Sequence, residues 1–188
     1  MPRDWPALLA ARAIDSLHAE RIIPRFVDSY VVQYGRYALQ THPTRYRELL
    51  ALIAREALLA MAVCVLEEAD LLTAQPQASS ARAKALRPRA FRQAFLSGLA
   101  RQQKWSAGDA LDFQSELRMY EELLCRRPSG KRARKPFEAA DHPFVDRCAI
   151  LLDPSFIEQA RIASSQALGE IESLARTLAQ RMLRGEGS

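Results

Sequence analysis

The stretch from Pro43 to Leu72 constrains the fold of this chain more than any other part of the sequence. Thr41 and Pro43 are typical of a helix start, and ten consecutive apolar residues run from Ala57 to Leu66. A helix with so wide an apolar face must be covered on nearly all sides to keep that face from water. We therefore predict a buried central helix over 41–72. Its apolar run is too short to span a bilayer.

The remaining sequence predicts a mainly α, bundle-like fold. Only seven glycines and 7% aromatic residues accompany many Ala, Leu and Arg, whose side chains lose little rotamer freedom in a helix. We predict one domain over 1–188 with about five to six helices, and one short buried strand near 144–152, where the sequence is an apolar run. The further helices are expected at 4–19, 26–39, 88–103, 106–125 and 154–184, with loops or linkers at 73–87 and 126–140.

Two of these helices carry specific local signals. Ser106 with Asp109 three residues later resembles a capping pair at a helix start. The C-terminal helix has an apolar stripe that begins with small residues, which suits close packing against another helix. That other helix could belong to a second copy or to the same chain. The stripe consists of Ala160, Ala163, Ala167, Ile171, Leu174 and Leu178.

The net charge of +5 is unevenly distributed along the chain. The stretch 71–108 contains seven cations and no acid, the following helix is acidic, and 126–135 is basic again. The cations of the first basic stretch are Arg82, Lys84, Arg87, Arg89, Arg92, Arg101 and Lys104. Those of the second are Arg126, Arg127, Lys131, Arg132, Arg134 and Lys135.

These thirteen cations are the candidate binding residues, and three interpretations of them remain open. They could form a surface that follows phosphates, because each neutralised phosphate releases condensed counterion. They could instead face the acidic blocks of the same protein or of a second copy, or an anionic membrane surface. Of the 27 cations 23 are Arg, which fits either a GC-rich bacterial genome or bidentate phosphate recognition.

The segment Leu99–Ala110 resembles the core of a helix-turn-helix, the DNA-binding motif in which a second helix enters the major groove. The sequence departs from that pattern at Lys104, where the family usually has Gly. Its second helix would also present Asp109 and Asp112 to phosphates. An ordinary helical hairpin is the rival interpretation.

The sequence indicates no cofactor and no metal site. His18, His42 and His142 lie far apart, and no Gly-Lys-Ser/Thr loop, G-x-S-x-G elbow or GxGxxG motif is present. Three scattered cysteines fit a reducing compartment, and the N-terminus has no secretory signal, so we expect a cytoplasmic protein without a transmembrane segment.

The leading hypothesis is a nucleic-acid-binding accessory or regulatory protein. The sequence favours a protein that is not an enzyme. A second hypothesis is a helical adaptor or inhibitor that binds an acidic protein partner. A third is a metal-dependent nucleic-acid-processing enzyme whose carboxylates gather from separate helices. A homo-oligomer formed through the C-terminal helix is compatible with the first two.

Overall fold

The computed structural model describes residues 5–19, 43–73, 88–124, 143–152 and 157–184. In these ranges the chain is helical apart from one turn, so the mainly α prediction is confirmed. The six helices are α1 (Trp5–Ala19), α4 (Pro43–Thr73), α6 (Pro88–Gln102), α7 (Ala107–Leu124), α8 (Pro143–Leu152) and α9 (Ile157–Arg184). The helix predicted at 26–39 lies outside the described residues. So does nearly all of the two predicted loops, although Thr73 ends α4.

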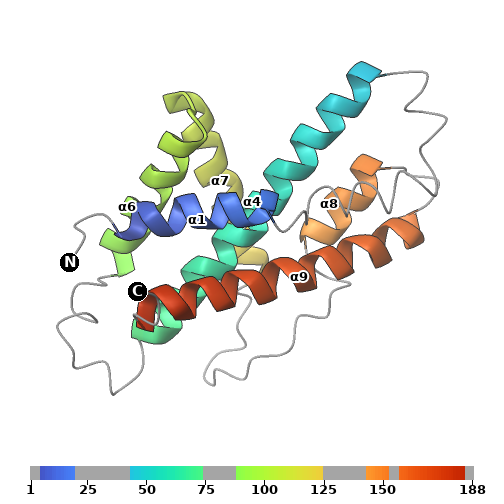
Figure 1. Ribbon diagram of the computed structural model, residues 1–188. Helices are drawn as coiled ribbons and strands as arrows, with labels where there is room; N and C mark the ends of the chain where they lie inside the picture. The colour runs from blue at the N-terminus through green and yellow to red at the C-terminus, as the bar shows by residue number, and fades with distance from the viewer. Residues whose placement is uncertain (1–4, 20–42, 74–87, 125–142, 153–156, 185–188) are drawn as a thin grey trace.

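The long helix α4 is the centre of the fold. Every residue from Ala57 to Leu66 is buried, so the middle of this helix has no side facing water. Each of the other five described helices packs against α4. Figure 1 shows it crossing the molecule diagonally, with α9 alongside it. The prediction of a buried central helix is confirmed.

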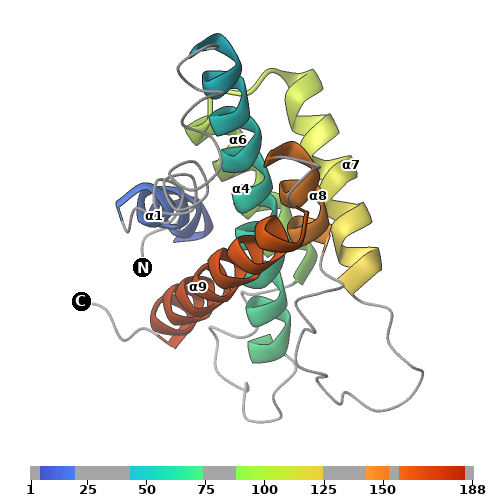
Figure 2. The same ribbon diagram turned by 90° about the vertical axis from the view of Figure 1, so that its right-hand side faces the viewer.

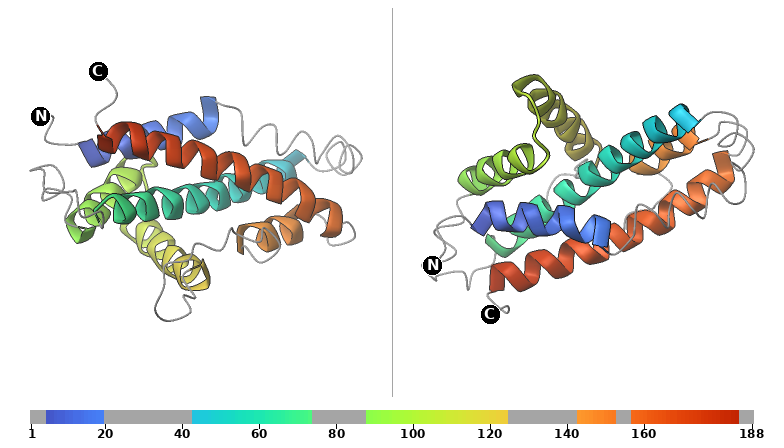
Figure 3. Two further views of the ribbon diagram at one scale, coloured as in Figure 1. Left: turned by 90° about the horizontal axis from the view of Figure 1, so that it is seen from below. Right: turned by 45° about the horizontal axis from the view of Figure 1, so that its top comes forward.

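The other helices cover different sides of α4. The long helix α9 lies against α4, α8 and α1, and α1 lies in turn against α6. Figure 2 shows α9 crossing α4, with α6 and α7 on the other side of α4. The right-hand view of Figure 3 shows α1 between α6 and α9. The other helices therefore surround α4 and do not form a flat layer.

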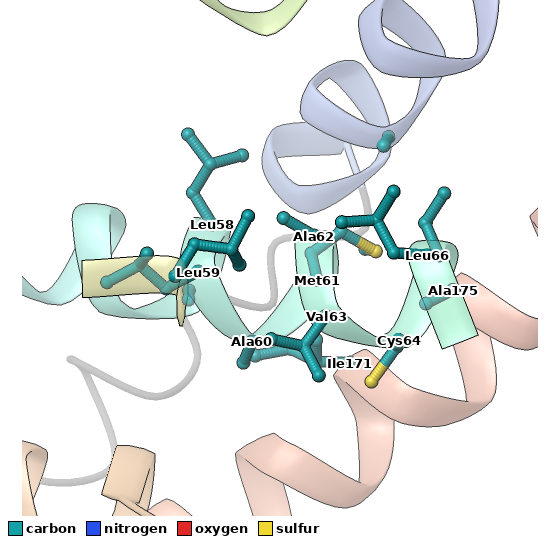
Figure 4. Close-up of a cluster of buried hydrophobic side chains, with 14 of the residues drawn as sticks. Leu58, Leu59, Ala60, Met61, Ala62, Val63, Cys64, Leu66, Ile171 and Ala175 are labelled. Carbon is teal, nitrogen blue, oxygen red and sulfur yellow. The ribbon is translucent and has the colours of Figure 1, made fainter. Parts of the chain in front are cut away.

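The small-residue part of α9 is used inside this chain. Ala167 and Ser164 are buried, and Ala163 packs against the core from a partly buried position. Figure 4 shows Ile171 and Ala175 of the same helix beside Cys64 of α4. The hypothesis of an oligomer through this stripe therefore loses the observation on which it rested.

The strand predicted near 144–152 is wrong, because these residues belong to α8. Pro143 occupies the first helical position and Asp146 lies in the first turn, both favourable for a helix start. Phe144 and Val145 are both buried, whereas Asp146 and Arg147 are both partly exposed. Two consecutive buried residues followed by two outer ones fit a helix, whereas a half-buried strand would alternate. A short apolar run fits either a strand or a helix, and the sequence-based prediction chose the strand.

None of the described helices combines the length and the apolar character needed to cross a membrane.

Substitution of Leu59, which is fully buried in α4, tests the central helix. Leu59→Ala should lower the free energy of unfolding by about 2–5 kcal/mol, because it removes apolar contacts and leaves a cavity. Leu111→Ala is the control, since the Leu111 side chain on α7 is 64% exposed, and should change stability by no more than about 0.5 kcal/mol. Urea unfolding measures both. Equal losses would place Leu59 outside the core.

The glycines of α6 and α9 provide a second test. A Cβ at Gly98 would lie 3.0 Å from the Cα of Ala7 and 3.2 Å from the Cβ of Ala10, so α1 and α6 approach closely there. A Cβ at Gly169 would meet nothing within 4 Å. Gly169→Ala should therefore raise the free energy of unfolding by about 0.5–1 kcal/mol through helix propensity.

Gly98→Leu should instead lower stability by about 1–3 kcal/mol, because the larger side chain forces α1 away from α6. Thermal melts of the two variants measure the difference. Stabilisation by Gly98→Leu would contradict the close approach of these helices.

Candidate functional site

Four of the thirteen predicted binding residues lie in the described part of the chain. Arg89, Arg101 and Lys104 are exposed, whereas Arg92 is partly buried. None of the described ion pairs includes Arg89, Arg101 or Lys104. The other nine lie outside the described residues: Arg82, Lys84, Arg87, Arg126, Arg127, Lys131, Arg132, Arg134 and Lys135.

Arg92 forms an ion pair within the protein, so its guanidinium is not free to bind a phosphate. Its two terminal nitrogens donate to the two carboxylate oxygens of Glu121 on α7, at 2.5 and 2.8 Å. This bidentate geometry is the strong form of an arginine–carboxylate pair. Arg92 therefore connects α6 to α7, and the sequence, which placed it among the phosphate-binding cations, did not indicate this role.

The exposed face of α6 carries a row of hydrogen-bond donors. Arg89, Gln93, Ser97 and Arg101 are all exposed and follow one another at intervals of four residues. At a rise of about 1.5 Å per residue, the row extends for roughly 18 Å along the helix. The opposite face holds Phe91, Phe95 and Leu99 in the core. Sequence reasoning missed Gln93 and Ser97, although their four-residue spacing from the two arginines was a usable signal.

The turn after α6 brings Lys104 to the surface. Lys104 has a φ of 54°, in the left-handed region that favours glycine, and this is the position where the helix-turn-helix pattern has Gly. Trp105 then folds back onto Phe113, with ring centroids 4.6 Å apart. The turn thus has a sharp backbone bend with an aromatic anchor beneath it.

The predicted capping pair at the start of α7 is confirmed. The backbone N–H and the hydroxyl of Ser106 donate to Asp109 Oδ2 at 3.0 and 2.7 Å, and the Asp109 N–H donates to Ser106 Oγ at 3.2 Å. These hydrogen bonds hold the pKa of Asp109 below its usual value because they stabilise the carboxylate. The ionised Asp109 therefore occupies the place where an anion would approach the α7 N-terminus.

The helices α6 and α7 are joined by a side-chain pair far from the turn between them. Arg92, near the start of α6, reaches Glu121, near the end of α7, so the two helices remain within side-chain reach far from the turn. The exposed side of α7 carries Asp109 and Asp112, which phosphates repel. These acids oppose the entry of α7 into a groove of DNA, and the hairpin interpretation stays a prediction.

A buried carboxylate joins the three helices α4, α7 and α8. Glu56 of α4 is only 3% exposed; it accepts a hydrogen bond from the Tyr120 hydroxyl of α7 and lies 3.2 Å from Arg147 Nε of α8. The Arg147 guanidinium also lies 5.8 Å from the centre of the Tyr120 ring. These contacts hold α7 and α8 against the first half of α4.

Burial raises the pKa of Glu56 above its ordinary value of 4.5, because the charged form loses its hydration. The Tyr120 hydrogen bond and the charge of Arg147 act in the opposite direction, but each is a smaller effect. Arg147 Nη1 is buried with no hydrogen-bond partner within the described chain. The cluster therefore connects the three helices α4, α7 and α8.

Further acidic residues are paired in the same manner. Arg55 Nε donates to Glu116 Oε2 at 3.0 Å between α4 and α7, and Arg176 Nε lies 3.9 Å from Glu68 Oε1 between α9 and α4. Burial raises the pKa of the nearby Cys64 thiol, which suits a core residue rather than a nucleophile. Within the described ranges no group of three His, Cys, Asp or Glu side chains could hold a metal ion.

Comparison with known protein families, with characterised proteins and with solved structures finds no significant match to this chain.

The Glu56 cluster generates a pH prediction. A raised pKa in the folded state means that the folded chain holds this proton more tightly than the unfolded chain does. The stability contributed in this way is fully present below pH 4.5 and is lost as the pH rises through the raised value.

Glu56→Gln removes this titration, so the free energy of unfolding of the wild type minus that of the variant should fall as the pH is raised above 4.5. Urea unfolding at several pH values measures the difference. A difference that grows with pH would mean that Arg147 and Tyr120 outweigh the burial of Glu56.

Proposed function

We propose that this chain is a nucleic-acid-binding accessory or regulatory protein that contacts phosphates through α6 and the arginine-rich segments on either side of the helices α6 and α7. The observation that carries the proposal is the exposed face of α6. Arg89 and Arg101 lie on it, Lys104 follows it, and the sequence from 71 to 108 has no acid. A surface with cations and no carboxylate of its own lowers the free energy of a bound polyanion.

The distribution of charge between α6 and α7 supports the same proposal. Three acids of α7 have partners other than Arg89 and Arg101: Glu121 holds Arg92, Glu116 holds Arg55, and Asp109 caps its own helix. Self-neutralisation of the basic stretch by the acidic helix, one of the alternatives, therefore accounts for Arg92 but not for Arg89 or Arg101. These two cations retain their charge for an external ligand.

A protein partner is the second candidate, and one observation favours it. Leu111 and Met119 of α7 are 64% and 43% exposed, so this helix presents two large apolar side chains to water. The adaptor hypothesis would use this face or the arginines of α6 against an acidic protein. The enzyme hypothesis has no comparable support, because it requires carboxylates that gather in one place.

Salt-dependent binding tests the proposal. The full chain should bind a fluorescently labelled DNA duplex at low salt, and the logarithm of its binding constant should fall linearly with the logarithm of salt concentration. Substitution of Arg127, Arg132 and Arg134 together by Ala should make this slope shallower by about 3, at roughly 0.9 per lost phosphate contact. Polarisation titrations measure both effects.

A substitution at Leu111 and Met119 serves as the matched comparison, because it should leave the salt slope unchanged if phosphate contact is the function. Elution from both heparin and duplex DNA columns at low salt would contradict the proposal. Retention that is unchanged by substitution of the arginines would exclude Arg127, Arg132 and Arg134 from the phosphate contact.

A further inference from the structure

The exposed row of α6 has a geometry that goes beyond its charge. The row begins with Arg89, ends with Arg101 and has the uncharged donors Gln93 and Ser97 between them. Each step of four residues turns about 40° around the helix, so the three steps from Arg89 to Arg101 wind the row about 120° around α6 over roughly 18 Å. Side chains with N–H and O–H donors of this kind contact phosphates and sugars in nucleic-acid complexes.

The row is held rigidly on both flanks. On one flank Gly98 lies against Ala7 and Ala10 of α1, and on the other Arg92 is paired with Glu121 of α7. Phe91 and Phe95 anchor the underside, with ring centroids 6.0 Å apart. The Cα atoms of the row therefore keep the regular spacing of a helix, which suits a ligand whose own charges are evenly spaced.

A helix must protrude from the protein surface to enter a groove of DNA, whereas α6 packs against α1 and α4. A helix with its side chains is about 10–12 Å wide and the major groove of B-DNA is about 12 Å wide, so α1, which packs closely along α6, obstructs the entry of α6 into that groove. The neighbouring α7 also brings Asp109 and Asp112 to the surface beside it. Contact with the phosphates along the outside of a helix meets neither obstacle.

The exposed face of α6 also lacks the aromatic side chains on which single-stranded nucleic acid stacks its bases. Proteins that bind single-stranded nucleic acid stack its bases on exposed aromatic side chains. On α6 both aromatic residues, Phe91 and Phe95, are buried, and Trp105 in the following turn packs on Phe113. A double helix keeps its bases stacked internally and presents phosphates at a regular rise of about 3.4 Å per strand.

We infer that the face of α6 formed by Arg89, Gln93, Ser97 and Arg101 lies along the phosphate backbone of a double-stranded nucleic acid, outside the grooves and without reading its sequence. This inference rests on the proposed function and names the ligand class and the binding mode of the same site. Arg89 and Arg101 contact phosphates at the two ends of the row, about five base-pair steps apart. Gln93 and Ser97 donate hydrogen bonds to the backbone between them.

The test compares two charge-matched double variants of the full chain. Arg89→Gln with Arg101→Gln removes the two cations of the row, and Arg118→Gln with Arg181→Gln removes two exposed cations from α7 and α9. All four positions are exposed, and circular dichroism melts should show that both variants remain folded. Each is titrated by polarisation against two DNA duplexes of unrelated sequence, an RNA duplex and a single strand of equal length.

The wild type should bind the two DNA duplexes equally and should bind a duplex more tightly than the single strand. The α6 variant should lose about 1.8 from the magnitude of its salt slope, at roughly 0.9 per phosphate contact, while the control variant keeps the wild-type slope. Gln93→Ala with Ser97→Ala should weaken duplex binding without changing the slope, because neither residue is charged. Whichever of the DNA and RNA duplexes binds more tightly identifies the source of the backbone.

Three results would overturn the inference while leaving the proposed function intact. They are equal slopes for the α6 variant and the control, tighter binding to the single strand, and a strong preference for one duplex sequence. Absence of binding by the wild type to every nucleic acid at low salt would overturn the proposed function itself.

Discussion

The burial of ten consecutive residues of α4 is the constraint on which the rest of the structure depends. Apolar surface left in water costs about 25 cal/mol per Å² compared with buried surface. A helix that is apolar on all sides is therefore stable only when other elements surround it. No single helix can do so, and the chain uses five in the described part. The packing of α9 along α4, and of four further helices against it, meets that requirement.

The same burial creates an electrostatic problem. Glu56 and Glu68 lie on the buried helix, and an unpaired carboxylate there would cost several kcal/mol. Arg147 of α8 and Arg176 of α9 approach them, and Tyr120 of α7 adds a hydrogen bond to Glu56. The charges therefore connect the surrounding helices to α4 in defined places, whereas apolar contact alone would allow them to slide.

Pairing inside the fold also determines which charges remain for a ligand. Arg92 and Arg89 are three residues apart in the same basic stretch, yet the first is held by Glu121 and the second faces water. The pair of helices α6 and α7 thus separates a row of donors from an acidic, partly apolar face. That separation connects the packing of these helices to the proposed contact with a nucleic-acid backbone.

The sequence by itself determined the helices, because their signals are local. The apolar run of α4, the pair Ser106 and Asp109 and the helix end before Gly185 all depend on residues within a few positions of each other. It failed at 144–152, where a short apolar run suits either a strand or a helix until its neighbours are known. Only the tertiary structure decided that Glu121 takes Arg92, that Glu56 meets Arg147, and that the side of α6 with Arg89, Gln93, Ser97 and Arg101 is the exposed one. Such pairings join residues far apart in the chain or depend on which face of a helix is covered, and no local pattern contains that information.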